Sequence, residues 1–429
     1  MAQPAETPVP VPGGVAPRPA PGPRSPAGPQ PPGASPPVGA SQPPGTSPTG
    51  VRRPGKARIL AVDAARCLAL IGMMGVHVLP EANSAAEPSA TWILFAGRAS
   101  ALFALLAGVS LAFGSGGRTL LEGRALRAAR AGTAVRALLI LALGLLLGYT
   151  EPDVDIILAY YGVMFLLAVP LLGLGPRTLV GLCAAFALAG PVLVLALQGV
   201  LPVPPDDNPT FTSLLTDPWV TLTQLLFTGG YPAVPWMAYM CAGLAIGRMD
   251  LGARRTGMRL LGFGVLLAAG AWVVSGIATA WAWGLGWRQT AILLVDGRDP
   301  RFDDGSWWWL AASTPYSAMP LELLHTIGTA MVALGVLLVA GRALRQIIEV
   351  LAPAGSMTLT LYSAHLVFLS LGLLGTSPFE SFGLQVGAAL LVGVLWQNLV
   401  GRGPLEAGVS AVSTRARVRA AGDYHRRAP

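Results

Sequence analysis

The chain has 429 residues, of which 53% are hydrophobic and only 12% are charged. The charged fraction of an average soluble domain is about 25%, so this chain lacks the polar side chains needed to cover a soluble fold. The composition therefore excludes a soluble cytoplasmic enzyme. The three cysteines, Cys67, Cys183 and Cys241, all lie within apolar runs, which excludes a secreted disulfide scaffold.

The net charge of +8 comes almost entirely from arginine, because Lys56 is the only lysine. Most of the arginines border apolar runs, where a membrane explains them better than a nucleic acid does. We therefore expect no nucleic-acid partner. Covalent chemistry at a lysine is also disfavoured, since Lys56 lies outside the apolar part of the chain.

Residues 1–57 hold 18 of the 38 prolines. Such a segment cannot bury enough apolar surface to offset its ordering entropy, so we expect a disordered cytoplasmic tail. Its proline spacing is also compatible with binding to an aromatic groove of a partner. The membrane domain is predicted to cover residues 58–401, and residues 402–429 are predicted to form a basic cytoplasmic tail.

The apolar runs from residue 58 onward are about 18 to 24 residues long, enough to cross a bilayer as helices. The predicted fold is therefore an all-α polytopic integral membrane protein with about ten transmembrane helices. The ten predicted spans are residues 59–80, 91–114, 135–150, 154–174, 178–200, 232–248, 260–283, 319–340, 356–375 and 383–401.

With these spans, the segments at one face carry 24 lysines and arginines, whereas those at the other face carry three. The positive-inside rule then predicts that both termini are cytoplasmic and that the chain is a multi-pass protein of the inner (plasma) membrane. Two outward loops are long, at about residues 201–231 and 284–318. The second contains Trp307, Trp308 and Trp309, typical of a membrane interface or of a lid over a cavity.

The first span contains three ionisable residues, Asp63, Arg66 and His77. Each such side chain costs a few kcal/mol in a membrane and needs a structural or functional reason. At about 100° per residue, Arg66 and Asp63 lie about 20° and 40° from His77 around the helix. Arg66 and His77 are about 16 Å apart along its axis. The three residues therefore share one side of the helix, in a stripe. Either Asp63 and Arg66 form an ion pair that only fixes helix packing or topology, or the stripe is a catalytic face with the His77 imidazole near the outer surface.

Further polar residues fall in the outer halves of other spans. Together they favour a polar cavity that opens outward, although each could instead be a packing residue. No spacing typical of a metal site occurs, so we expect no metal. The residues proposed to bind substrate are Arg98, Asp155, Tyr160, Glu322, His325, Tyr362 and His365.

A predicted cytoplasmic loop contains five arginines, several at a spacing of three residues. This spacing suits a phosphate-bearing donor such as coenzyme A, but topological charge and anionic lipid explain it as well. The five are Arg118, Arg124, Arg127, Arg130 and Arg136.

The motif Asp63-Ala-Ala-Arg66, followed by His77, resembles the first-helix signature of membrane acyltransferases. The stretches GRASALFALLAGVSLAF, ILAYYGVMFLLAVPLL, YPAVPWMAYMCAGLAIGRMDL and LAPAGSMTLTLYSAH resemble the heparan-α-glucosaminide N-acetyltransferase-like and YeiB-like bacterial membrane proteins. The resemblance spans about residues 58–401. It departs at Cys67, where the signature has glycine, and at residues 81–91, which lack the histidine of the acetyltransferase branch.

This resemblance implies transfer of an acyl group, in the first instance acetyl, from cytoplasmic acyl-CoA to a sugar or a lipid-linked acceptor across the membrane. His77 is then the general base, with Asp63 and Arg66 near the donor. Arg98 and Glu322 would orient His77 or bind the acceptor. Acetyl-CoA or another acyl-CoA is a donor substrate, and no bound cofactor is expected.

Two other functions fit the same residues. A transporter or flippase would use the buried polar groups to bind substrate or to relay protons. A non-enzymatic scaffold would display its proline-rich tail to partners. The bilayer is the expected environment in each case, and homodimerisation is left open.

Overall fold

The computed structural model describes residues 59–422 except residues 86, 204, 297–305, 342 and 373–376. The expected disordered tail, residues 1–57, and the last residues, 423–429, lie outside the described residues. Over the described ranges the chain is helical, and its only β pairing is an isolated bridge between Ala82 and Pro88. The all-α prediction is therefore confirmed for this part of the chain.

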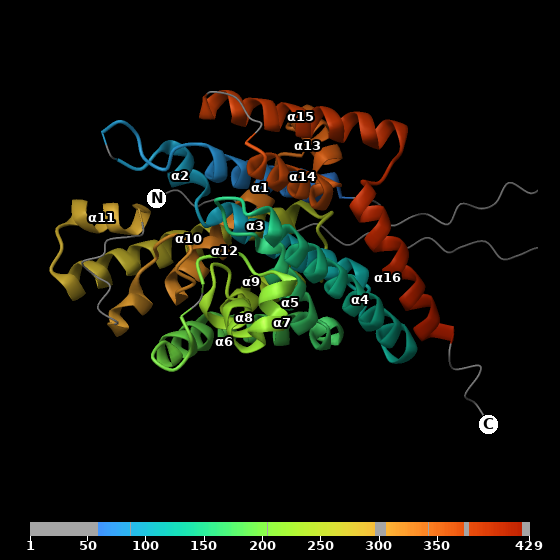
Figure 1. The fold of residues 1–429 in the computed structure, drawn as a ribbon, viewed down its shortest axis with the longest axis horizontal. Helices are drawn as coiled ribbons and strands as arrows, with labels where there is room; N and C mark the ends of the chain where they lie inside the picture. The colour runs from blue at the N-terminus through green and yellow to red at the C-terminus, as the bar shows by residue number, and fades with distance from the viewer. Residues whose placement is uncertain are drawn as a thin grey trace, which may run out of the picture. The chain divides into compact units, whose positions relative to one another are not determined.

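The helices follow one another with short connections (Figure 1). In chain order they are α1 Leu60–Val78, α2 Ala90–Phe95, α3 Arg98–Gly114, α4 Gly123–Leu147, η1 Gly148–Thr150, α5 Ile157–Ala168, η2 Pro170–Gly173, α6 Pro176–Leu197, α7 Phe211–Thr216, α8 Pro218–Thr223, η3 Gln224–Thr228, α9 Ala233–Gly247, α10 Arg254–Trp283, α11 Trp287–Asp296, η5 Trp307–Ala311, α12 Pro320–Val339, α13 Arg345–Gly355, α14 Thr358–Ser370, α15 Pro378–Leu399 and α16 Pro404–Gly422.

In the described part of the chain, seven helical segments are long and apolar enough to cross a membrane. They are α1, α2 with α3, α4 with η1, α6, α10, α12 and α15. The number is eight if α13 and α14, which bend by 71° at their junction, form one broken span. The protein is thus a multi-span membrane protein.

The two remaining predicted spans correspond to α5 and α9, which are apolar but only 12 and 15 residues long. Proline explains both short lengths, because it lacks the N–H that continues a helix. Pro170 follows the end of α5, and Pro232 precedes α9. The apolar run therefore overestimated the length of α5, whereas the predicted span 232–248 agrees with α9 to within one residue at each end.

Helix α9 lies inside the bundle, and every residue from Pro235 to Gly247 is buried. Helices α3, α5 and α6 pack against it. The approach of α3 is close because glycines meet the facing backbone. A Cβ atom at Gly108 would lie 2.4 Å from the carbonyl oxygen of Met240, and one at Gly243 would lie 1.9 Å from that of Leu105. Such contacts between small residues are a main source of helix association in membranes.

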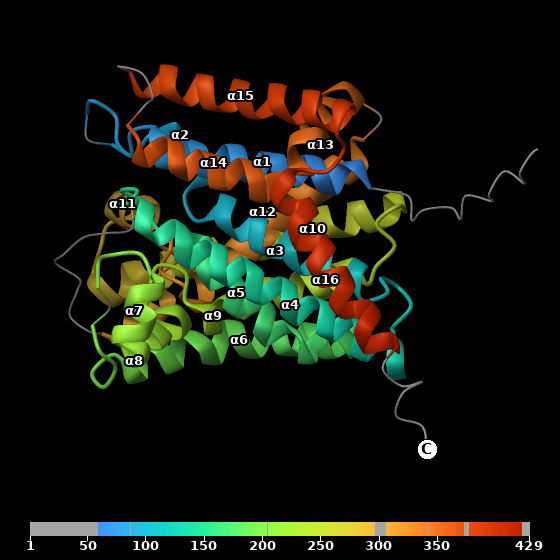
Figure 2. The same ribbon diagram turned by 45° about the vertical axis from the view of Figure 1, so that its right-hand side comes forward.

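Helix α15 runs along one edge of the bundle beside α13 and α14, whereas α6 runs along the opposite edge (Figures 1 and 2). Helix α16 crosses α4, and Arg417 donates to the carbonyl oxygen of Gly114 over 3.1 Å. Residues 404–422 of the predicted basic tail thus form a helix that lies against α4.

The segment with the five arginines is helical from Gly123 onward, because α4 begins there and carries Arg124, Arg127, Arg130 and Arg136. Arginine is a good helix former, and its long stem lets the charged end reach water. The helix therefore continues past the end of the apolar run.

The two long loops that are predicted to face outward contain helices as well. Residues 201–231 include α7, α8 and η3, and residues 284–318 include α11 and η5. Trp308 and Trp309 pack against Trp281 and Trp283 of α10, with ring centroids 5.3 Å and 5.1 Å apart. The tryptophan run is therefore held against the end of α10.

Replacing Gly243 by alanine is expected to destabilise the protein. The added Cβ would collide with the Leu105 carbonyl, so α3 and α9 must move apart at a cost of about 1–3 kcal/mol. We expect a lower midpoint of thermal unfolding in detergent. Gly262→Ala in α10 is the control, since no described atom lies within 4 Å of its Cβ position. Equal midpoints for Gly243→Ala and wild type would contradict this packing.

Candidate functional site

His77, in the last turn of α1, faces α14. Its Nδ1 lies 3.0 Å from Nε2 of His365, and the two rings are stacked with centroids 5.3 Å apart and planes 11° from parallel. Nδ1 of His365 is hydrogen-bonded to Oε1 of Gln385 on α15. His365 and Gln385 are 2% and 7% exposed. We call His77 and His365 the histidine pair.

Tyr362 connects the histidine pair to a group of tyrosines. Its ring centroid lies 6.3 Å from that of His365, and its hydroxyl is hydrogen-bonded to the backbone of Ile157. Tyr231 packs edge-on against Tyr160 and Tyr316, with centroids 5.7 Å and 6.2 Å apart.

The exposed carboxylate of Asp155 lies within electrostatic range of all four tyrosines. We call these five residues the tyrosine cluster: Asp155, Tyr160, Tyr231, Tyr316 and Tyr362. A carboxylate above aromatic rings and hydroxyls offers both hydrogen bonds and apolar contact to a polar ligand.

Tyr316 has an unusual backbone, with φ of 60°. A left-handed conformation is strained for a bulky residue and is most often found at functional sites. Burial, reinforced by nearby carboxylates, raises the pKa of Tyr316 to about 12. Its phenol therefore stays protonated at neutral pH and can act as a hydrogen-bond donor.

Arg98 and His325 form a second contact at this end of the bundle. An Arg98 guanidinium nitrogen lies 3.1 Å from Nε2 of His325, whose Nδ1 lies 3.0 Å from the carbonyl oxygen of Ala268. A carbonyl oxygen only accepts, so Nδ1 of His325 carries the hydrogen and Nε2 accepts from Arg98. Both ring nitrogens of His325 are thus engaged, which makes it a poorer proton acceptor than His77.

Glu322 is 3% exposed and lies near the Tyr239 hydroxyl, with 3.4 Å between the oxygens. The same hydroxyl lies 2.7 Å from the Thr326 hydroxyl, which also donates to the Glu322 carbonyl oxygen over 2.7 Å. The Glu322 side chain approaches Gly97, the residue before Arg98. Nδ1 of His77 contacts His365, so the roles predicted for Arg98 and Glu322, orienting His77 or binding the acceptor, stay predictions.

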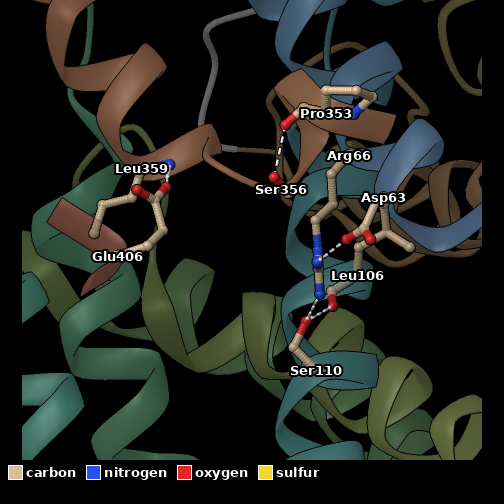
Figure 3. A network of polar contacts seen from close by, with 8 residues as sticks. All are labelled: Asp63, Arg66, Leu106, Ser110, Pro353, Ser356, Leu359 and Glu406. Atoms are coloured by element: carbon tan, nitrogen blue, oxygen red, sulfur yellow. Dashed lines mark hydrogen bonds and ion pairs between the residues drawn. The ribbon is translucent and has the colours of Figure 1, made fainter. Parts of the chain in front are cut away.

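Asp63 and Arg66 form a separate polar cluster at the other end of α1 (Figure 3). Nη1 of Arg66 lies 2.7 Å from a carboxylate oxygen of Asp63, and Nη2 contacts the Ser110 hydroxyl on α3. The Arg66 side chain is 24% exposed. The structure thus separates the residues of the first-helix motif into two sites, one at each end of the helix.

Glu406 on α16 lies near this second cluster and binds the start of α14. Its carboxylate accepts from the backbone N–H group of Leu359 over 2.7 Å (Figure 3) and from that of Thr360 over 3.2 Å. It also accepts from the Thr360 hydroxyl over 2.6 Å. A carboxylate at a helix N-terminus is favourable, so α16 is fixed to the helix that carries His365.

Several residues of these clusters are absent from the sequence-based set. Gln385 and Ser110 are single polar residues in apolar runs, a signal that the search for ionisable groups passed over. Tyr231 and Tyr316 lie between helices, where no periodicity identifies them. In the described part of the chain, no three histidine, cysteine or acidic side chains lie close enough to hold a metal ion.

Comparison with known families gives one match. The sequence model of the family "Heparan-alpha-glucosaminide N-acetyltransferase, catalytic" matches residues 58–274, just over half of the chain. The search of curated proteins finds no match. The matched range contains Asp63, Arg66 and His77, whereas His365 and Gln385 lie beyond it. The chain belongs to the heparan-alpha-glucosaminide N-acetyltransferase catalytic family of membrane acyltransferases.

Proposed function

We propose that this protein transfers an acyl group, in the simplest case acetyl, from acyl-CoA to a sugar or another extracytoplasmic acceptor. Family membership supports acetyl transfer. The observation that carries the proposal is the histidine pair, which lies beside the tyrosine cluster at one end of the bundle. Acyl-CoA enters this proposal as the donor substrate and not as a bound cofactor.

The proposed topology has ten crossings of the inner membrane, with α5 and α9 as short crossings and α13–α14 as a broken one. The end that carries Arg66, Arg118 and Arg248 is cytoplasmic in this topology, following the positive-inside rule. The histidine pair and the tyrosine cluster then face the opposite side. Both termini lie in the cytoplasm.

His77 is the proposed general base. Its Nδ1 contacts His365, so Nε2 is the ring nitrogen that can meet a substrate. Nε2 takes the proton of the acceptor hydroxyl or amine while the acceptor oxygen or nitrogen attacks the thioester carbonyl carbon. The new C–O or C–N bond forms, the C–S bond breaks, and His77 returns the proton to the CoA thiolate.

The tyrosine cluster is the proposed acceptor site. The Asp155 carboxylate accepts hydrogen bonds from acceptor hydroxyls, and the protonated Tyr316 phenol donates one. Arg98 and Glu322 lie at the edge of this region, where Arg98 interacts electrostatically with Glu322 and Tyr316. At the other end of α1, Arg66 is proposed to hold the phosphate-bearing part of the donor, while Asp63 fixes the guanidinium.

Replacing His77 by glutamine is expected to lower kcat by about 100-fold or more, the usual contribution of a general base. The assay follows radiolabel from acetyl-CoA to glucosamine with purified protein in lipid vesicles. His425→Gln is the control, because the proposal gives that histidine no role. Equal rates for His77→Gln and wild type would contradict the proposed base. Glucosamine uptake into vesicles without acetyl-CoA would favour the transporter instead.

Replacing Asp155 by asparagine is expected to raise KM for glucosamine by about tenfold, because a hydrogen bond to a charged group contributes more than one to a neutral group. KM for acetyl-CoA should stay unchanged, since the donor site is at the other end of α1. Asp153→Asn is the matched control, as Asp153 is exposed and two residues away. An unchanged KM for glucosamine in Asp155→Asn would remove Asp155 from the acceptor site.

A further inference from the structure

Three polar side chains from three helices form a chain of hydrogen bonds: Gln385 on α15, His365 on α14 and His77 on α1. His365 and Gln385 are almost fully buried, so water does not replace these hydrogen bonds. The stacked rings of the histidine pair keep the two imidazoles in a fixed relative orientation.

The glutamine determines the direction of this chain. Its Oε1 faces His365, and an amide oxygen only accepts, so Nδ1 of His365 carries a hydrogen. A neutral imidazole has one N–H, so Nε2 of His365 has a lone pair and accepts from Nδ1 of His77. Nε2 of His77 is then the nitrogen with the lone pair.

Two histidines alone would not select this direction. The pair could equally donate from His365 to His77, which would place the hydrogen on Nε2 of His77 and abolish its basicity there. We propose that Gln385 is a positioning residue that holds His77 in the tautomer with an unprotonated Nε2. This inference rests on the proposed function, because it supplies the lone pair that takes the acceptor proton.

The Gln385 amide is also compatible with a protonated histidine pair. When His77 gains a proton at Nε2, its Nδ1–H bond to His365 becomes charge-assisted and stabilises the imidazolium. His365 can share the charge while its Nδ1–H donates to Gln385. The neutral amide orients the rings without placing a negative charge in the membrane, where an ionised group is costly.

The test is ¹⁵N NMR of protein labelled at histidine, because nitrogen chemical shifts distinguish N–H from lone-pair nitrogen. The chain has only four histidines, so each signal is assigned by a single His→Gln replacement. In wild type we expect hydrogen on Nδ1 of both His77 and His365. In Gln385→Met, which keeps the volume and lacks the acceptor, we expect hydrogen on Nε2 of at least one of them. His325 should not change, because its Nδ1 faces Ala268.

Gln385→Glu keeps an acceptor oxygen at the same reach, so Nδ1 of His365 should keep its hydrogen. Gln397→Met, on the same helix, is the matched control and should also match wild type. In the transfer assay, Gln385→Met should lower kcat about tenfold with both KM values unchanged, as expected for the loss of one orienting hydrogen bond. An altered His325 signal in Gln385→Met would reveal misfolding of that variant. The inference would then be tested by the spectra of wild type and Gln385→Glu, in which Nδ1 of His365 must carry hydrogen.

Hydrogen on Nε2 of His77 in wild type, or unchanged tautomers in Gln385→Met, would overturn the inference. These outcomes are distinct from failure of the proposed function, because the spectra need no substrate. The expected tautomers in a wild-type protein that transfers no label would refute acyl transfer and leave the role of Gln385 in place.

Discussion

The structure depends on one constraint, that a polar side chain within a membrane-spanning helix must have a partner inside the protein, and for several of them this partner lies on another helix. Arg66 joins α1 to α3 through Ser110, and Arg98 joins α3 to α12 through His325. His77 joins α1 to α14, and Gln385 adds α15. The same few contacts that satisfy these groups also fix where the helices lie, so the site and the fold share their polar residues.

Close packing makes these partnerships geometrically possible. Where Gly108 and Gly243 meet, α3 and α9 approach until backbone touches backbone. Gly355 at the end of α13 lies against the backbone of Asp63 in the same way. A side chain at any of these positions would separate α1, α3 or α9 by more than a hydrogen bond tolerates. The small residues therefore matter to the chemistry although they carry no chemical group.

Hydrophobic runs predicted the helices well, because apolar length is the physical requirement for crossing a bilayer. Periodicity placed Asp63, Arg66 and His77 on one stripe of α1, but a stripe does not reveal which helix it faces. The partners His365 and Gln385 lie about 290 and 310 residues further along the chain, and their meeting with His77 is a consequence of tertiary packing. Two helix ends were predicted wrongly for a different reason: arginine extends α4 beyond its apolar run, whereas Pro170 ends α5 before its apolar run ends.

The separation of the two clusters along α1 bears on how a reaction could join two sides of a membrane. Arg66 and His77 differ by about 16 Å along the helix axis, whereas the hydrocarbon layer is about 30 Å thick. In the proposed orientation each cluster is therefore near its own aqueous face, and only about half of the layer lies between them. An acyl group on an extended donor then has to reach from one cluster to the other and not across the whole bilayer. The donor phosphates stay with Arg66, and the acceptor stays with the tyrosine cluster. Neither the phosphates nor the acceptor therefore has to enter the apolar middle of the bilayer.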